Sequence, residues 1–403
     1  MKLSELSDVA LSQKESVAST DTGIERDLLP KLPEARSHAL VVVGIRRCGK
    51  STLAQQYVNK TRLDYFYMNF EDIRLSSFET GDYRLLDKLI KDSKCKLLFF
   101  DEIQNVPKWE LYIRQKLNEN FRVVLTGSNA SMLSKELGTK LTGRHLEKEL
   151  FPFSYSEFLR WAKKKRRVET FDEYLQSGGF PEYLKVGDAD ILANLQNDIL
   201  YRDIAVRYKL RDVGSLRRLF SYLASNASQK ISPSKLTSVC GVKSPTTVLE
   251  YLSHFESSFL IQAMPQFAWS LKAQSVAPKK IYISDLGLIQ IASLSFNKNL
   301  GALLENFVFN HLRLQTKELC YFSDSNSECD FIANPRKNPL CVQVCYDMNT
   351  DNQDREINGV FSALDFFNAK EGYVLTRNSR DEILKKGKAV HVLPAWEYSK
   401  LFQ

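Results

Sequence analysis

The segment 44–51, Gly-Ile-Arg-Arg-Cys-Gly-Lys-Ser, constrains this chain more than any other part of its sequence. It fits the pattern GxxxxGK[ST], in which glycines let the backbone wrap around a polyphosphate. An all-apolar run at 39–43, typical of a strand buried on both faces, precedes it, and a helical stretch follows. Amide groups at the start of such a helix attract negative charge. The sequence therefore predicts a phosphate-binding loop between a strand and a helix.

The side chains of this loop indicate its ligand. Lys50 is expected to reach the β- and γ-phosphates of a nucleotide, and Ser51 to coordinate Mg²⁺. The other residues expected to contact the nucleotide are Gly44, Arg47, Cys48, Gly49 and Thr52. A guanine-binding Asn-Lys-x-Asp segment is missing, because the Asn-Lys pairs at 59–60 and 297–298 lack the aspartate. ATP with Mg²⁺ is therefore the expected cofactor.

Two acidic residues follow a second apolar run. The run at 97–100 ends in Asp101 and Glu102. An acid at the carboxyl tip of a strand beside a phosphate loop is well placed to coordinate Mg²⁺, which makes Asp101 the expected metal ligand. Glu102 is expected to orient or deprotonate the attacking water. A loop that passes phosphate to a small acceptor has no need of this glutamate, so ATP hydrolysis is favoured.

Two further positions are candidates for catalysis. The strand-like run at 122–125 is followed by Thr-Gly-Ser-Asn, so Ser128 or Asn129 could contact the γ-phosphate or the water. Arg144 could neutralise charge on the transferring phosphate, in its own chain or in a neighbouring copy. An ordinary polar turn at 128–129 and a solvated arginine are the structural alternatives, and they stay open.

The order of expected elements defines the fold class. Strand-like and helical segments alternate up to about residue 150, which predicts an α/β fold with a three-layer parallel sheet. Helical patterns dominate from about 151. Between 211 and 283, three helix-sized segments precede strand-like pieces, the order of a winged helix. From about 300, a helix precedes further strands.

Composition sets limits on partners. A length of 403 residues predicts two to three domains. The 56 basic and 48 acidic side chains give a net charge of +8, which permits contact with nucleic acid without requiring it. Five consecutive basic residues at 163–167 are interpreted as a solvated linker rather than a phosphate-binding patch.

The sequence argues against a membrane protein, a protein stabilised by disulfides and a zinc-binding protein. No apolar run approaches the ~18 residues needed to cross a bilayer, and the polar N-terminus has no signal-peptide core. Seven scattered cysteines without CxxC spacing argue against a disulfide framework or a zinc ribbon. The expected protein is soluble, cytoplasmic and independent of membranes.

Several motifs together resemble one family. They are GIRRCGKSTL, YFYMNFED, LLFFDEIQNVPKWE, VVLTGSNASML, LTGRHLEKELFPFSYSEFL, GGFPEYL, YRDIAVR, ISDLGL, LLENFVFNHL, SECDF and QVCYD. The chain is similar over nearly its whole length to archaeal and bacterial AAA-plus ATPases that carry a C-terminal domain of unknown function. The resemblance implies an ATP-binding core, a helical lid, a winged helix and a terminal nuclease-like fold. It assigns the ATP site to Gly44, Gly49, Lys50, Ser51, Asp101 and Glu102, and gives Glu71 and Asp72 a structural role or one near Mg²⁺.

The chain is expected to divide into five segments. The expected domains are an N-terminal helical extension (1–36), a P-loop ATPase core (37–150), a helical lid (151–210), a winged helix (211–283) and a PD-(D/E)XK-like domain (284–403).

The last of these segments departs from an active nuclease. Glu305, Asp330 and Gln343 stand in the order of a PD-(D/E)XK core, in which acids hold Mg²⁺. Gln343 replaces a carboxylate, and Cys345 stands where a lysine is needed, so it supplies no fixed positive charge. Lys337 is the nearest lysine in sequence. We therefore expect an inactive scaffold.

Three functions compete on this basis. The first is an ATPase that hydrolyses Mg-ATP to switch its attached C-terminal domains. The second is a nucleotide-gated module that binds DNA or protein through its C-terminal half. The third, an ATP-dependent nuclease, is disfavoured by the missing lysine. The sequence leaves the oligomeric state open.

Overall fold

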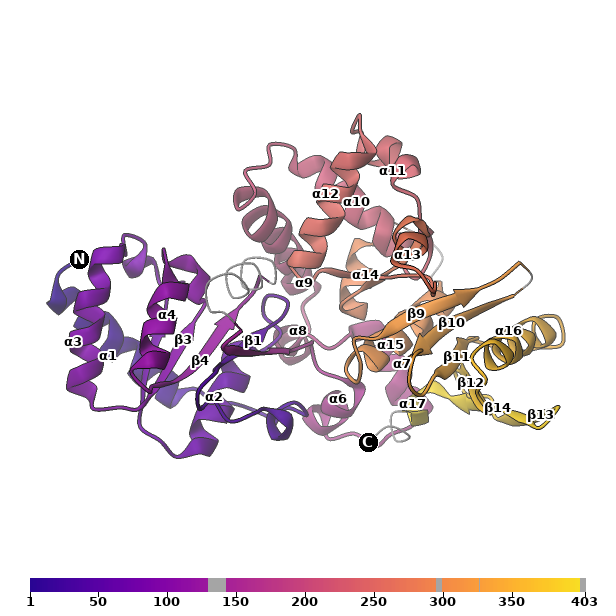
Figure 1. The fold of residues 1–403 in the computed structure, drawn as a ribbon, viewed down its shortest axis with the longest axis horizontal. Helices are drawn as coiled ribbons and strands as arrows, with labels where there is room; N and C mark the ends of the chain where they lie inside the picture. The colour runs from indigo at the N-terminus through magenta and orange to yellow at the C-terminus, as the bar shows by residue number, and fades with distance from the viewer. Residues whose placement is uncertain (130–142, 295–298, 326, 399–403) are drawn as a thin grey trace. The chain divides into compact units, whose positions relative to one another are not determined.

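The computed structural model describes residues 1–129, 143–294, 299–325 and 327–398. These residues form two compact units, one of residues 1–151 with 257–259 and the other of residues 152–256 with 260–403 (Figure 1). Residues 130–142, between the candidate catalytic residues Asn129 and Arg144, lie outside the described part of the chain.

Unit 1 contains a five-stranded sheet in the order β2-β3-β4-β1-β5. All neighbouring strands in this sheet run parallel. Their bounds are β1 Ala39–Val43, β2 Tyr65–Asn69, β3 Leu97–Asp101, β4 Arg122–Gly127 and β5 His145–Glu149. Every residue of β1 and β3 is buried, as expected for strands covered on both faces. The α/β class with a parallel sheet is confirmed.

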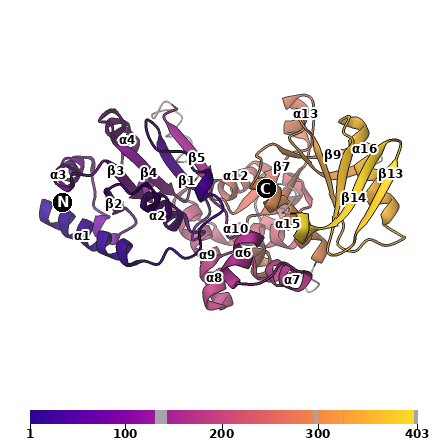
Figure 2. The same ribbon diagram turned by 90° about the horizontal axis from the view of Figure 1, so that it is seen from below.

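Helices cover this sheet. Their bounds are α1 Leu3–Ser19, α2 Lys50–Thr61, α3 Tyr83–Ser93 and α4 Trp109–Asn118. Helix α2 packs against β1, β3 and β4, while α4 packs against β4 from the other side of the sheet (Figure 2). Helix α1 packs on β2, and the amide of Gln13 exchanges hydrogen bonds with the backbone of Asn69 at 3.0 and 2.8 Å. The N-terminal helix is therefore part of the packed unit.

Unit 2 begins with helices. Their bounds are α6 Tyr155–Ala162, α7 Val168–Ser177, α8 Pro181–Val186 and α9 Ala189–Asp198, followed by a π-helical stretch at Ile199–Val206. Next come α10 Val213–Ser225, α11 Pro233–Cys240 and α12 Pro245–Ser257. A small antiparallel sheet in the order β6-β8-β7 follows these helices, formed by Lys230–Ile231, Lys279–Ile283 and Ile261–Met264. The short helix α13, Leu271–Val276, lies between β7 and β8 in the chain.

The remainder of unit 2 is built on a six-stranded mixed sheet in the order β13-β14-β12-β11-β10-β9. The strands are β9 Leu319–Ser323, β10 Glu328–Ala333, β11 Leu340–Val344, β12 Glu371–Thr376, β13 Asp381–Lys385 and β14 Lys388–Pro394. The helices are α14 Leu286–Ala292, α15 Leu300–Arg313, α16 Gln353–Phe366 and α17 Ala395–Tyr398. Helix α16 packs on β10, β11 and β12, and α15 contacts β11 and β8 (Figure 1).

Asp285 joins two segments of unit 2 that are far apart in sequence. It caps the amino end of α14 by accepting a hydrogen bond from the Gly287 amide at 2.8 Å. Its other oxygen accepts from the Gly179 amide at 2.7 Å. Complete burial raises the pKa of this carboxyl to about 6, against the lowering effect of those amides. A Cβ atom at Gly178 would lie 2.2 Å from the carboxylate, so only glycine fits there.

All seven cysteines fall within the described residues, and each is free and buried. Burial raises the pKa of each of these thiols above its ordinary value. The expectation that the chain has no disulfide framework agrees with this arrangement.

Candidate functional site

The glycine-rich loop connects β1 to α2 at the carboxyl edge of the parallel sheet. Gly44 has φ +154° and packs so closely that a Cβ atom would lie 2.2 Å from the carbonyl oxygen of Leu150. Gly49 caps α2 with φ +99°, a conformation that side chains rarely adopt. The backbone therefore requires glycine at both positions of the motif.

Four of the expected site residues converge at this edge. The Lys50 ammonium donates to the Ile45 carbonyl at 3.1 Å and lies 3.8 Å from Oε1 of Glu102. Asp101 ends β3, and its carboxylate is hydrogen-bonded to the side chain of Ser51 in the first turn of α2. A lysine, a hydroxyl and two carboxylates from separate segments thus meet beside one loop.

Strand β4 supports the two acids from the neighbouring position in the sheet. The Thr126 hydroxyl donates to Asp101 and accepts from the Glu102 amide at 3.1 Å. The hydroxyl and amide of Ser128 both donate to Oε2 of Glu102, at 3.1 and 3.3 Å. Gln104 donates to the same oxygen. The sequence singled out Ser128, but it missed Thr126 and Gln104.

The two acids differ in their electrostatic surroundings. Burial, together with the charge of Glu102, raises the pKa of Asp101 above its ordinary value. Burial alone would also raise the pKa of Glu102, but Lys50 and the donors of Gln104 and Ser128 outweigh it and lower that pKa. Glu102 therefore stays ionised beside the loop, as a residue that accepts a proton from water must be.

The other expected loop residues take different positions. Arg47 is exposed with φ +61°, and Thr52 is half-buried in the first turn of α2. The Cys48 thiol points inward and donates to the Leu150 carbonyl at 3.4 Å, so only its backbone could face a nucleotide. Asn129 directly follows Ser128 and is completely buried. A catalytic role for Asn129 stays a prediction.

Arg144 lies at the opposite edge of the sheet. Its carbonyl accepts from the amide of Ala39, the first residue of β1, whereas the glycine-rich loop follows Val43. Its guanidinium donates to Asn118 at 2.6 Å and to the Ser37 carbonyl at 3.4 Å. A five-residue strand separates the two edges by roughly 16 Å, beyond the reach of an arginine. Arg144 therefore does not contact the glycine-rich loop in this structure, and its catalytic role, in its own chain or in a neighbouring copy, stays a prediction.

Arg26, which the sequence did not indicate, supports the glycine-rich loop from behind. It is buried, and its guanidinium donates to the Cys48 carbonyl at 2.9 Å and to the Phe151 carbonyl at 2.7 Å. It thereby connects the loop to the segment after β5.

The two acids at 71 and 72 form contacts that stabilise the fold. Glu71 pairs with Arg46 of the glycine-rich loop. Asp72 accepts hydrogen bonds from Gln13 and Arg74. These contacts agree with a structural role for both acids.

A second polar cluster lies in unit 2. Gln343 accepts from the Asp330 amide at 3.0 Å and donates to Glu356 at 2.6 Å. Lys280 of β8 donates to Asp330 at 2.8 Å and to Glu305 at 3.2 Å. The structure therefore brings Glu305 and Asp330 together, and the lysine beside them is Lys280. No local spacing pattern indicates this lysine, because it precedes Glu305 in the chain and lies on β8, a strand of the three-stranded sheet.

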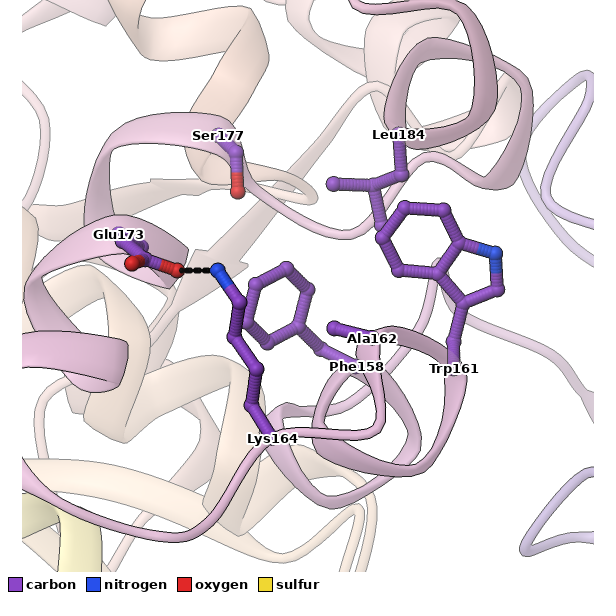
Figure 3. A pocket seen from close by; sticks show the side chains of 7 residues that line it. All are labelled: Phe158, Trp161, Ala162, Lys164, Glu173, Ser177 and Leu184. Atoms are coloured by element: carbon purple, nitrogen blue, oxygen red, sulfur yellow. Dashed lines mark hydrogen bonds and ion pairs between the residues drawn. The ribbon is translucent and has the colours of Figure 1, made fainter.

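A shallow hollow of about 510 Å³ opens among α6, α7 and α8. Trp161 and Leu184 line one side, Phe158 lies at its base, and Lys164 pairs with Glu173 at 2.5 Å on the other side (Figure 3). Lys164 belongs to the basic run at 163–167. This run is therefore not wholly solvated, since Arg166 also donates to the Trp396 carbonyl at 2.6 Å.

Comparison with known proteins identifies the family. Residues 36–159 match the model of an AAA domain, and residues 168–299 match the model of a domain of unknown function. An uncharacterized protein of Methanocaldococcus jannaschii is 31% identical over 98% of this chain and 93% of its own length. The chain belongs to the AAA-domain family that carries this C-terminal domain of unknown function.

Other similar proteins extend the comparison. An uncharacterized protein of Haemophilus influenzae is 31% identical over 78% of this chain and 84% of its own length. Among solved structures, a variant of RuvB from Thermotoga maritima has 15% identity and a TM-score of 0.29, covering 57% of this chain and 82% of that one. The AAA domain of this family member has the P-loop NTPase arrangement described above for unit 1.

Two features are absent from the described residues. Among those residues, no helix is both long enough and apolar enough to span a bilayer. Within the same part of the chain, no group of three or more His, Cys, Asp or Glu side chains has the arrangement of a metal site.

Proposed function

We propose that this family member is an ATPase that binds and hydrolyses Mg-ATP and thereby switches its attached C-terminal domains. The observation that supports hydrolysis is the convergence of Lys50, Ser51, Asp101 and Glu102 at the carboxyl edge of the sheet. The side chains of Thr126 and Ser128 hold both acids in fixed positions.

Each of these residues has a proposed task. Lys50 binds the β- and γ-phosphates, and the loop amides contact the same groups. Hydroxyl and carboxylate oxygens are the donors that Mg²⁺ prefers, so Ser51 and Asp101 fit its coordination. Bound Mg²⁺ would neutralise charge on the phosphates. Glu102, which is ionised beside Lys50, orients water and accepts its proton.

Steady-state ATP hydrolysis by the purified chain tests this proposal. We expect Lys50→Ala to lose nucleotide binding and Glu102→Gln to bind ATP but turn over roughly 10²–10⁴-fold more slowly. Lys14→Ala and Glu15→Gln are matched controls, because both side chains are exposed on α1. Normal turnover by Glu102→Gln would refute the role of this glutamate.

We also propose the domain identities that the sequence suggested. Residues 151–210 form a helical lid, 211–283 a winged helix and 284–403 a nuclease-like domain. The order α10, β6, α11, α12, β7, β8, with its antiparallel three-stranded sheet, supports the winged helix. The helix α15, the β9–β11 meander, helix α16 and the parallel strand β12 support the nuclease-like fold.

A second candidate function is a nucleotide-gated binding module for DNA or protein. The surface of α12 favours protein, because this helix has no lysine or arginine and exposes 53% of Leu249. A recognition helix for DNA normally offers basic or amide side chains. Duplex DNA binding, measured by fluorescence anisotropy at 50 and 200 mM salt, decides between the partners. Affinity that falls steeply with salt would favour DNA, and no measurable binding would favour protein.

A further inference from the structure

Lys280 occupies the centre of the polar cluster in unit 2. Its ammonium lies 2.8 Å from Oδ1 of Asp330, 2.9 Å from Oε1 of Glu328 and 3.2 Å from Oε1 of Glu305. Only 6% of the Lys280 side chain is exposed. The Lys280 ammonium therefore occupies the position between three carboxylate groups in which a divalent cation would have to lie.

A second lysine reaches the same cluster from the neighbouring strand. Lys230 of β6 lies directly opposite Lys280 in the antiparallel pair, and its ammonium is 2.5 Å from Oε2 of Glu328. Both ammonium groups also lie over the ring of Tyr321, at 5.0 and 5.6 Å from its centre. Like charges directly opposite each other destabilise a sheet. The carboxylates and the ring therefore compensate a repulsion that β6 and β8 would otherwise have.

The carboxylates have further donors besides the lysines. The Tyr282 hydroxyl donates to Oε1 of Glu305 at 2.8 Å, and the Val344 amide donates to Oδ2 of Asp330 at 3.0 Å. Residues of β6, β8 and β11 thus hold the acids in place. A metal ion would have to displace the Lys280 ammonium and compete with these bonds.

The charges of the cluster nearly balance without a metal ion. Two ammonium groups face three carboxyl groups. Burial, followed by the charge of Asp330, raises the pKa of Glu305 above its ordinary value. Burial alone would lower the pKa of Lys280, but Asp330, Glu305 and Glu328 raise it, so the ammonium stays charged.

We propose that the ammonium groups of Lys280 and Lys230 neutralise the carboxylates of this polar cluster and so connect the β6–β8 sheet to α15 and β10. The cluster therefore stabilises the contact between these elements without a metal ion. It binds a divalent cation only when the Lys280 ammonium is removed. This inference is independent of the ATPase proposal, since none of its residues belongs to unit 1.

Titration of the nucleotide-free full chain with Mn²⁺, followed by electron paramagnetic resonance, tests the proposal. We expect Lys280→Ala to bind one Mn²⁺ at least about tenfold more tightly than the wild type, because a unit charge about 3 Å from the site is gone. Adding Asp330→Asn should abolish the gain. Lys280→Arg keeps the charge and should not gain the site, and neither should Lys279→Ala, whose exposed lysine precedes Lys280 on β8.

Thermal unfolding provides a second measurement in case Lys280→Ala folds poorly. We expect Mn²⁺ to raise the Tm of Lys280→Ala or Lys280→Met and to leave the Tm of the wild type unchanged. Three results would overturn the proposal: Asp330-dependent Mn²⁺ binding by the wild type, Mg²⁺-dependent DNA cleavage by the wild type that Asp330→Asn abolishes, or no effect of Mn²⁺ on either variant.

Discussion

Arg26 shows how one buried side chain can set the shape of a loop far away in sequence. Its guanidinium bridges the carbonyls of Cys48 and Phe151, and its backbone amide donates to Gln56 of α2 at 3.3 Å. The glycine-rich loop has little rigidity of its own, since glycine permits many backbone conformations. Arg26 therefore stabilises the loop in one conformation.

The substitution Arg26→Ala should destabilise unit 1 by about 2–3 kcal/mol, because two buried carbonyls lose charged donors. It should also weaken ATP binding. Chemical denaturation and nucleotide titration measure the two effects. Arg36→Ala is the matched control, because the Arg36 side chain is 73% exposed and pairs with exposed Glu34. Equal stability of both variants would show that Arg26 has no supporting role.

Sequence patterns located some of the important residues and missed others for a physical reason. Gly44, Lys50, Asp101 and Glu102 were predictable, because each lies at or shortly after the end of an apolar strand. Arg26, Thr126 and Lys280 act through contacts between elements, which no local spacing records. The position of Arg144 was not predictable either, because its sequence neighbourhood does not tell which edge of the sheet it occupies.

At the scale of elements, Asp285 is a helix cap that also fixes a distant loop. Its two oxygens separately accept from Gly287 at the start of α14 and from Gly179 before α8. An asparagine has only one acceptor oxygen, and its amide nitrogen would face one of these backbone donors. The carboxylate is therefore specifically needed, although a helix cap alone would tolerate an amide.

Asp285→Asn should lower the free energy of unfolding by about 1–3 kcal/mol, the cost of leaving a buried donor unpaired. Urea denaturation of both proteins measures the difference. Asp188→Asn provides the comparison, because Asp188 caps α9 with an exposed carboxylate that accepts from Asp190 at 2.9 Å. The proposed double role would be wrong if both substitutions had the same small effect.

Strands whose residues are fully buried were predicted more accurately than strands that are only partly buried. The fully apolar runs became β1 and β3 within one residue of the expected bounds. Strand β5 was not among the predicted strands, because His145–Glu149 has charged residues and only partial burial at the edge of the sheet. Edge strands need less apolar sequence, so their signal is weak.

At the scale of the whole molecule, nucleotide binding in unit 1 has to reach unit 2 if hydrolysis switches the C-terminal domains. Hydrogen exchange measured by mass spectrometry reports both units at once. In the Glu102→Gln variant with Mg-ATP, we expect protection at 44–52 and a change of exchange in α6–α9, relative to Mg-ADP.

The Lys50→Ala variant should show neither change, since it lacks the phosphate-binding ammonium. Protection confined to unit 1 would retain ATP binding but contradict the switching of attached domains. Changes in unit 2 that persist in Lys50→Ala would have a cause other than nucleotide binding at this loop.

The burial of all seven cysteines has a consequence for the chemistry of the surface. Thiol reagents and oxidants attack the thiolate, and each native thiol is both enclosed and held protonated. The folded chain therefore resists alkylation and intermolecular crosslinking without any cysteine being replaced. A single cysteine introduced on an exposed helix would react alone, so probes could be attached to either unit of the otherwise native protein.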